Sequence, residues 1–467
     1  MSYQEFLNSK RFSIKNTGFT VKRENLNSML FDFQKDIVLW ALKKGKAALF
    51  EDCGLGKTPQ LQEWAKLVCE YTGGNVLVVA PLAVSQQMKR EAEKFGNTVT
   101  ICRHHSDVQK GINITNYEMI EHFNISEFVG VVLDESSILK GYDRHYSQTL
   151  IEKCSKVPYK LSCTATPSPN DYMELGTQCE WLGVMSRTEM LATFFVHDGG
   201  DTAKWRLKGH AEDKFWEWVA SWAVVLQKPS DLDYDDCDFI LPGLEIIEHI
   251  VKVDTQKEQG QLNIEGYAEY ARTLDERRAA RNNSLDERVK KAAEICNESD
   301  GQVLVWCDLN KESELLKKSI SGSVEVKGSD KSEFKEKTAV DFATSNIKYL
   351  VSKPSIFGWG LNFQSCHNMI FVGLSDSYEL LYQAIRRCYR FGQKQKVNVH
   401  IVISEQEGHV KANIERKEAD YRNMMTNMVQ HTKKINTEEV HGTHRESIEY
   451  NPKIEMKIPK WLRGQIA

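Results

Sequence analysis

Long hydrophobic runs are absent from this sequence. No stretch approaches the roughly eighteen consecutive apolar residues that a membrane-spanning helix needs. The first residues, Met1 to Glu5, also lack the basic and apolar regions of a secretory signal. These absences argue against a membrane protein or a secreted one, and we expect a cytoplasmic or nuclear location.

Paired cysteines are missing as well. The eleven cysteines are scattered singly, none forms a C-x-x-C pair, and their number is odd. This pattern argues against a disulfide framework or a zinc cluster, and it indicates reduced thiols. His104 and His105 have no cysteine nearby, so we expect them in a loop and not at a metal.

The sequence also lacks a surplus of positive charge. The chain has 61 Lys and Arg against 65 Asp and Glu, which gives a formal net charge of -4. Proteins that coat nucleic acid through bulk charge are basic, so any nucleic-acid surface here must be local.

The length and the pattern of the chain indicate two α/β domains. A chain of 467 residues exceeds what one hydrophobic core usually serves. Short β-branched runs alternate with longer amphipathic stretches in the first half, and the alternation resumes after about residue 245, which predicts parallel sheets flanked by helices. The expected domains are 1–170 and 244–429, with a tail over 430–467. The expected strands are 47–50, 76–80, 112–115, 129–133 and 159–163, then 245–253, 303–307, 348–352, 368–372 and 397–403.

Residues 171–243 form an aromatic-rich segment that is predicted to be a helical insertion. It holds half of the ten tryptophans. Such a cluster is typical of a small core, whereas a base-stacking platform would need exposed rings. The insertion is also a possible binding place for a protein partner. The five rings belong to Trp181, Trp205, Trp216, Trp218 and Trp222.

A glycine-rich loop, Gly54 to Thr58, follows the first expected strand. Its glycines would let backbone N–H groups approach phosphate oxygens, while Lys57 would meet the β and γ phosphates and the Thr58 hydroxyl would bind magnesium. Pro59 suits the first turn of the following helix, whose positive end would face the phosphates. Glu51 occupies the place of the usual first glycine. The loop predicts ATP and Mg²⁺ as ligands.

Two adjacent carboxylates, Asp134 and Glu135, follow another apolar strand. Asp134 would hold magnesium, and Glu135 would orient and deprotonate the attacking water. A turn or a helix N-cap is the alternative for an isolated Asp-Glu-Ser. Gln34, upstream of the phosphate loop, carries an amide that could read the adenine edge. The expected nucleotide contacts are therefore Gln34, Gly54, Leu55, Gly56, Lys57, Thr58 and Asp134.

Residues 164–167 end a further strand with two threonines and a proline. The hydroxyls of Thr164 and Thr166 could couple the phosphate site to a bound polymer, and a Pro-ended turn is the alternative. Far downstream, residues 383–393 hold three arginines and two glutamines, a fixed cluster of cations that invites an anion. Together with the phosphate loop, this cluster predicts a nucleotide held between two domains.

With these residues in place, the chain resembles the superfamily-two helicases, and within them the Snf-type double-stranded DNA translocases. The ending Arg390 to Gln393 is the mark most specific to that branch. The resemblance implies two RecA-like domains with an ATP cleft between them, and it makes Gln383, Arg387 and Arg390 part of the catalytic site, but not Arg386. The segments that carry it are 33–34, 54–60, 80–84, 116–118, 134–140, 164–167, 303–307, 358–363 and 383–393.

Several residues depart from the pattern of that branch. Ser137 replaces its usual histidine, Met88 stands where a tryptophan is common, and residues 375–379 replace its Asp-Trp-Asn-Pro segment. These departures leave the ATPase residues intact but argue against close kinship with chromatin remodellers. The compact length and the Trp-rich insertion resemble phage or bacterial members.

The leading hypothesis is an ATPase that depends on DNA and moves along the duplex as a monomer. A strand-separating DNA or RNA helicase is one alternative, and an ATP-gated clamp on nucleic acid or protein is another. Contacts to backbone phosphates suit a motor because they carry little sequence information. Lys89 and Arg90 could equally line a solvated helix. The expected contacts are Ser85, Gln86, Lys89, Asn116, Tyr117, Asn362 and Gln364.

Overall fold

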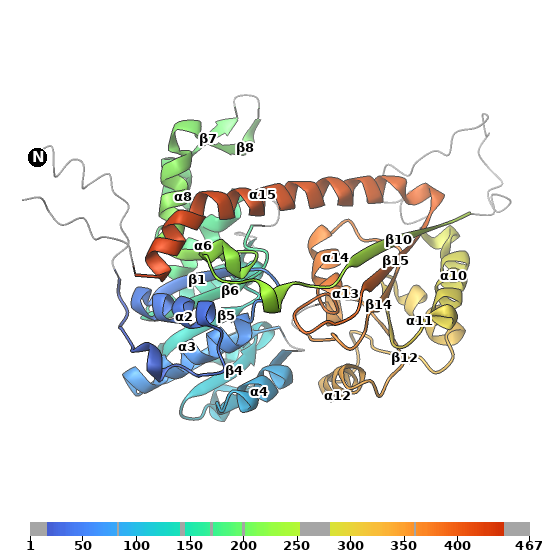
Figure 1. The fold of residues 1–467 in the computed structure, drawn as a ribbon, viewed down its shortest axis with the longest axis horizontal. Coiled ribbons are helices and arrows are strands. Elements are labelled where there is room, and N and C mark those ends of the chain that lie inside the picture. Colours follow the sequence, from blue (N-terminus) through green and yellow to red (C-terminus); the bar gives the residue numbers. More distant parts are fainter. Residues whose placement is uncertain are drawn as a thin grey trace, which may run out of the picture.

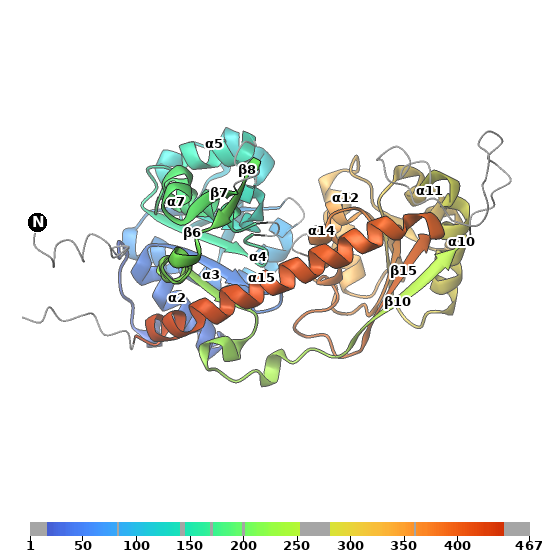
Figure 2. The ribbon, with the colours of Figure 1, turned by 90° about the horizontal axis from the view of Figure 1, so that it is seen from above.

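Two α/β domains lie side by side, and one long helix, α15, runs across both (Figures 1 and 2). No helix in the described part of the chain is long and apolar enough to cross a membrane. All eleven cysteines are free, as expected. The computed structural model describes residues 16–81, 84–140, 145–168, 171–198, 201–252, 281–358 and 361–442.

The first domain is built on a seven-stranded parallel sheet with the order β3-β4-β2-β5-β6-β1-β9. All five strands predicted for this half are confirmed, each to within one residue at either end. Strands β3 and β9 were not predicted, since one is only three residues long and the other lies in the Trp-rich segment. The strands are β1 (Lys46–Glu51), β2 (Asn75–Ala80), β3 (Val99–Ile101), β4 (Ile112–Asn116), β5 (Phe128–Asp134), β6 (Tyr159–Thr164) and β9 (Ala223–Leu226).

Helix α3 (Lys57–Thr72) starts directly at the glycine-rich loop. Its apolar residues Leu61, Trp64 and Val68 recur at helical spacing and are completely buried against the sheet. The helix ends at Gly73, whose φ of 71° is the left-handed conformation common at helix C-termini. The other helices that precede the Trp-rich segment are α2 (Asp32–Lys44), α4 (Ser85–Lys94) and α5 (His145–Lys153).

The Trp-rich segment belongs to the core of the first domain. Trp181, Trp216, Trp218 and Trp222 are all buried, and they join a cluster that includes residues of β2 and β5. The core interpretation is therefore confirmed for these four rings, which cannot stack on bases, whereas Trp205 is only partly buried. The segment also contains strands, unlike the helical insertion expected. Its elements are α6 (Leu175–Leu182), α7 (Arg187–Phe194), the antiparallel pair β7 (Phe195–Asp198) and β8 (Asp201–Leu207), α8 (Glu212–Ala220) and β9.

The second domain is built on a six-stranded parallel sheet with the order β10-β15-β14-β11-β13-β12. The five strands predicted for this half are present, and the short β12 was not predicted. The strands are β10 (Leu244–Val251), β11 (Val303–Cys307), β12 (Val324–Glu325), β13 (Tyr349–Ser352), β14 (Asn368–Val372) and β15 (Val397–Ser404). The helices are α10 (Leu285–Glu298), α11 (Asn310–Ser319), α12 (Ser332–Ala343), α13 (Pro354–Phe357) and α14 (Tyr378–Ile385).

Helix α15 (Gly408–Val440) leaves the second domain after β15 and returns to the first. Its 33 residues correspond to a length of about 50 Å. Met425 and Met428 are buried in the core of the first domain, and the Tyr421 hydroxyl donates to the Ala165 carbonyl at 2.7 Å. The expected start of a C-terminal tail, residue 430, lies inside this helix, and residues 443–467 of that tail fall outside the described residues.

The core position of the tryptophans can be tested through stability. Trp222 packs edge-on against Phe50 and Trp218, with ring centroids 5.8 Å and 5.4 Å away. We expect Trp222→Ala to lower the free energy of unfolding by about 3–5 kcal/mol, because it leaves a cavity in a packed core. Urea denaturation measures this change. Trp205→Ala is the control and should cost much less, and equal losses for the two variants would contradict this packing.

Candidate nucleotide site between the two domains

Three loops of the first domain meet at one edge of its sheet. Strand β6 pairs with β1 on one side and with β5 on the other. The carboxyl ends of parallel strands are where α/β sheets bind their ligands. The glycine-rich loop after β1, Asp134 and Glu135 at the end of β5, and Thr164 to Thr166 after β6 are therefore neighbours, as the sequence predicts.

The glycine-rich loop has the conformation of a phosphate-binding loop. Gly54 and Gly56 have φ values of 96° and 81°, a region that favours glycine. Space also requires them, because a Cβ on Gly54 would lie 3.0 Å from the Phe391 nitrogen, and one on Gly56 would lie 2.3 Å from the Gln34 side chain. No side chain caps the start of α3. Its first N–H groups can therefore serve an anion, and the loop fits a triphosphate.

Lys57 lies at the start of α3, where its ammonium contacts the loop. The ammonium donates to the carbonyls of Glu51 at 2.8 Å and Asp52 at 3.1 Å. These acceptors are neutral, so they leave the positive charge of the lysine available for a phosphate. Thr58 follows it in the same turn and is partly exposed.

Asp134 and Glu135 are both nearly buried at the end of β5. Burial, and then the charge of Glu135, raise the pKa of Asp134 to about 7. Glu135 has a φ of 54°, a strained conformation for this residue type that is typical of functional sites. One of its carboxylate oxygens is buried and has no hydrogen-bond partner among the described residues.

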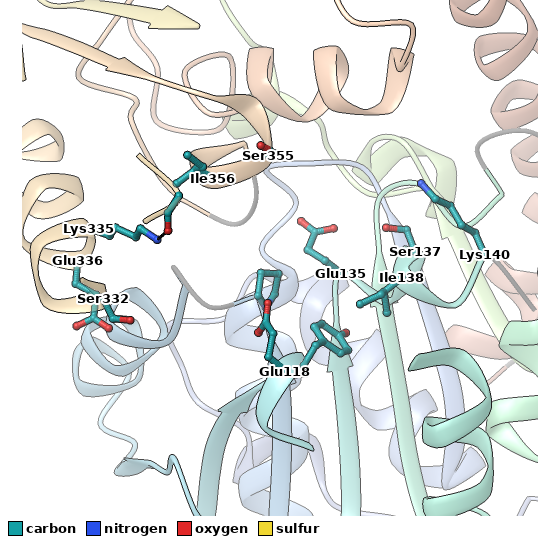
Figure 3. A pocket seen from close by; sticks show the side chains of 13 residues that line it. Glu118, Glu135, Ser137, Ile138, Lys140, Ser332, Lys335, Glu336, Ser355 and Ile356 are labelled. Carbon is teal, nitrogen blue, oxygen red and sulfur yellow. Dashed lines mark hydrogen bonds between the residues drawn. The ribbon is translucent and has the colours of Figure 1, made fainter. Parts of the chain in front are cut away.

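The Glu135 carboxylate points into a cavity between the domains (Figure 3). The cavity holds about 530 Å³, and its walls come from both domains. Glu118, Ser137 and Lys140 line the side of the first domain, and Lys335 and Ser355 line the opposite side. An unpartnered carboxylate that faces such a space is placed to hold a water molecule.

A magnesium ion would need few ligands from the protein. The described residues contain no group of three or more His, Cys, Asp or Glu that could hold a metal ion. Mg²⁺ usually keeps several waters and takes one or two protein ligands besides the phosphates. The side chains of Thr58, in the first turn of α3, and Asp134, at the end of β5, are of the types that fit this role.

Gln34 supports the phosphate loop. Its amide oxygen accepts from the Phe31 N–H at 3.0 Å, and its amide nitrogen donates to the Leu55 carbonyl at 2.8 Å. Both ends of the amide therefore already contact the protein, which the adenine-reading hypothesis did not anticipate. Only its second hydrogen and second lone pair remain for a base.

Two of the three arginines of residues 383–393, Arg387 and Arg390, are held by groups of their own domain. The Arg387 side chain donates to the Gln383 carbonyl and the Gln383 side chain, both at 2.8 Å, and to the Leu361 carbonyl at 3.2 Å. Arg390 also donates to the Leu361 carbonyl at 3.2 Å, and burial with its neighbour Arg387 lowers its pKa to about 10. All of these acceptors lie in the second domain.

Arg386 is the arginine that reaches the phosphate loop. It forms an ion pair with Asp52 at 3.0 Å and also donates to the Cys53 carbonyl. The Tyr382 hydroxyl donates to the same aspartate. Sequence reasoning missed this contact, because the resemblance selects only Arg387 and Arg390. The sequence signals that could have indicated it are Arg386, next to Arg387, and Asp52, next to the phosphate loop.

Glu379, at the start of α14, contacts two motifs of the first domain. It forms an ion pair with Lys140 and accepts from the Thr166 hydroxyl at 3.3 Å. Thr166 thus touches the second domain, and its coupling role stays a prediction. The hydroxyl of Thr164 instead accepts from the Thr166 N–H at 3.1 Å, inside its own loop.

Part of the chain is similar to known helicases. Residues 286–392, from α10 to the end of the arginine cluster, match the helicase conserved C-terminal domain. A DNA annealing helicase and endonuclease, ZRANB3, is 25% identical over 185 residues in Homo sapiens and 27% identical over 177 residues in Bos taurus. The matched segment covers 34% of this chain and 16% of each relative.

These matches make part of the chain similar to helicases, in line with the resemblance that the sequence motifs indicate. A solved Sulfolobus solfataricus SWI2/SNF2 ATPase core in complex with dsDNA aligns with 16% identity, over 90% of this chain and 99% of that one. Its TM-score is 0.40, which is too low to support an inference.

Three of the nucleic-acid contacts expected for a Snf-type motor are engaged within the protein. Tyr117 is buried and its hydroxyl donates to the Asp134 carbonyl at 2.6 Å, so it supports the catalytic loop. The Asn116 side chain caps the turn that follows β4. Asn362 donates to Glu91 at 2.9 Å, across the domain boundary. Each of these side chains already has a hydrogen-bond partner within the protein, because it lies where two chain segments meet.

The remaining expected contacts differ in exposure. Ser85 is buried at the start of α4, and Gln86 is partly buried. Lys89 and Gln364 are exposed, on α4 and after Asn362 respectively. Lys89 and Gln364 are therefore the residues of the expected set most accessible to a polymer.

The burial of Glu51 beside the phosphate loop can be tested through the effect of pH on stability. Burial raises this pKa from 4.5 to about 7, against smaller opposing effects of Lys57 and Gln60. The folded chain then holds the proton more tightly than the unfolded chain, so the free energy of unfolding falls as pH rises from about 4.5 to about 7. Glu51→Gln removes this titration and should gain up to about 3 kcal/mol relative to the parent between about pH 5 and pH 8.

Urea denaturation at the two pH values measures this gain. The exposed Glu93→Gln is the matched control and should have the same stability as the parent at both pH values. Asp134 titrates in the same range, so the parent and the Glu51→Gln variant share its contribution, and the difference between them isolates Glu51. An equal stability difference at both pH values would contradict the raised pKa.

Proposed function

We propose that the chain is an ATPase that depends on DNA and uses hydrolysis to move along double-stranded DNA. The observation that carries this proposal is the contact of the arginine segment of the second domain with the phosphate loop of the first, beside the Asp134–Glu135 pair. The name of the human relative, a DNA annealing helicase and endonuclease, supports DNA as the partner. A single chain contains both halves of the site, so a monomer suffices.

The residues of the first domain bind the substrate and direct the water. Lys57 and the first N–H groups of α3 hold the phosphates of ATP, and Glu135 orients and deprotonates the attacking water. Magnesium, held by Thr58 and Asp134, would neutralise phosphate charge. Burial, and then the charge of Glu135, raise the pKa of Asp134, and a bound cation would favour its ionised form.

The arginines of the second domain complete the site. Arg387 and Arg390 are preorganised by the carbonyl oxygens of their own domain. Burial, and then the positive charge of Arg387, lower the pKa of Arg390, so the two cations repel each other. An anion between the domains relieves that repulsion, and small movements of the cleft would bring the two guanidinium groups to the γ-phosphate.

Movement along DNA would follow from opening and closing of this cleft. Each ATP cycle changes the contacts of α14 with the first domain, so one domain steps past the other. The exposed Lys89 and Gln364 lie on different domains and would hold phosphates of the track.

Substitution of the proposed base tests the hydrolysis step. Glu135→Gln keeps the side-chain size but cannot accept the proton, so we expect ATP binding to remain and turnover to fall at least about 100-fold. Steady-state ATPase assays and fluorescent-nucleotide binding measure the two properties. Glu118→Gln is the matched control, because Glu118 lines the same cavity and is exposed. Near-normal turnover of Glu135→Gln would refute the assigned base.

The track is tested by the polymer that stimulates turnover. We expect duplex DNA to raise the ATPase rate more than single-stranded DNA or RNA, and we expect the protein to displace a triplex-forming strand. Unwinding of a tailed duplex without triplex displacement would favour a strand-separating helicase. Binding of DNA that depends on ATP without stimulated turnover would favour a clamp.

A further inference from the structure

Helix α14 and the residue that follows it connect the second domain to the first at two separate places. Glu379, in its first turn, contacts Lys140 and Thr166. Tyr382 and Arg386, toward its end, contact the phosphate loop. The two contacts have opposite polarity. The second domain contributes the anion Glu379 to one and the cation Arg386 to the other. Two contacts of opposite polarity can form together in only one relative position of the two domains.

The Arg386 guanidinium is held in place by its own domain. It lies over the rings of Tyr382 and Tyr389, 5.9 Å and 5.6 Å from their centroids. Stacking on two aromatic faces orients a guanidinium and reduces the entropy that an ion pair costs. Arg386 is also 9% exposed, so water screens its interactions weakly.

Asp52 is the partner of this guanidinium, and it stands directly before the phosphate-binding residues. Its carboxylate accepts from the Cys53 N–H at 2.6 Å, from the Tyr382 hydroxyl and from Arg386. A carboxylate so close to a polyanion site repels phosphates unless a cation neutralises it. Arg386 supplies that cation from the other domain.

The second acceptor of Arg386 bears on the shape of the loop. A phosphate loop binds its ligand through N–H groups that point inward, so its carbonyl groups must point away. Arg386 donates to the carbonyl of Cys53, the residue immediately before Gly54. The contact holds this carbonyl toward the second domain, and Gly54 itself lies against the backbone of Phe391.

We propose that Arg386 is a positioning residue through which the second domain completes the phosphate loop and sets its affinity for ATP. It neutralises Asp52 and fixes the Cys53 carbonyl, while Arg387 and Arg390 act on the reacting phosphate. Closure of the two domains therefore strengthens the binding of nucleotide, and bound nucleotide strengthens closure by the same factor. This inference rests on the proposed ATPase function.

Nucleotide binding to the full-length protein tests the proposal. The probe is a fluorescent ATP analogue with magnesium, titrated without DNA. We expect Arg386→Ala to weaken binding about tenfold or more, because it leaves a charged carboxylate uncompensated beside the phosphates. Arg386→Lys should recover part of the loss, since it restores the charge without the fork of donors. In ATPase assays KM should rise by a larger factor than kcat falls.

A second substitution separates this role from general damage. Asp52→Asn removes the carboxylate charge that Arg386 neutralises. The double variant Asp52→Asn with Arg386→Ala should therefore bind the probe within about threefold of Asp52→Asn alone, the signature of coupled residues. Arg416→Ala is the matched control, because that arginine lies on the exposed face of α15 and should leave affinity unchanged.

The possible outcomes distinguish this inference from the ATPase function on which it rests. If the parent protein binds the probe, Lys57→Ala does not, and Arg386→Ala binds like the parent, this inference is wrong and the nucleotide site stands. A double variant as weak as Arg386→Ala would also overturn it, because the loss would not depend on Asp52. A parent protein that fails to bind the probe would overturn both.

Discussion

The docking of α14 on the loops of the first domain is the interaction on which the site depends. Each domain alone holds an incomplete set of groups, with the phosphate loop and the catalytic carboxylate on one side and the arginines on the other. Two oppositely charged contacts, Glu379 with Lys140 and Arg386 with Asp52, join these sets. Ion pairs of this kind contribute little as isolated surface contacts, but burial and exact pairing make them costly to mismatch. They define which relative position of the domains is the closed one.

Sequence reasoning located the elements of the fold because the determinants are local. Strands such as 303–307 and 368–372 are buried β-branched or apolar runs, and the structure places both where they were expected. The convergence of the three loops at the strand ends could be predicted for the same reason, since strand ends in a parallel sheet meet at one edge. Strand β9 was not predicted, because its four residues lie in the Trp-rich segment, which we expected to be helical.

The details of the interface could not be read in the same way. Arg386 and Arg387 are adjacent and chemically identical, and only the direction of the chain after α14 sends one across the cleft and keeps the other in its own domain. Asn362 and Tyr117 carry groups suited to a phosphate backbone, yet they are engaged by Glu91 and by the Asp134 carbonyl. Partners that lie hundreds of residues apart, or on a neighbouring strand, are set by tertiary packing and leave no signal in local spacing.

The path of α15 has a consequence for the order in which the chain folds. Its C-terminal half belongs to the first domain, where Met425 and Met428 enter the core, although the whole second sheet precedes it in the chain. The second domain is thus inserted into the first in terms of connectivity. During synthesis from the N-terminus, the second domain has all its strands before the first domain receives its last helix. The first domain cannot complete its apolar core until the ribosome has synthesised residues near 440. It is therefore the later of the two domains to finish folding.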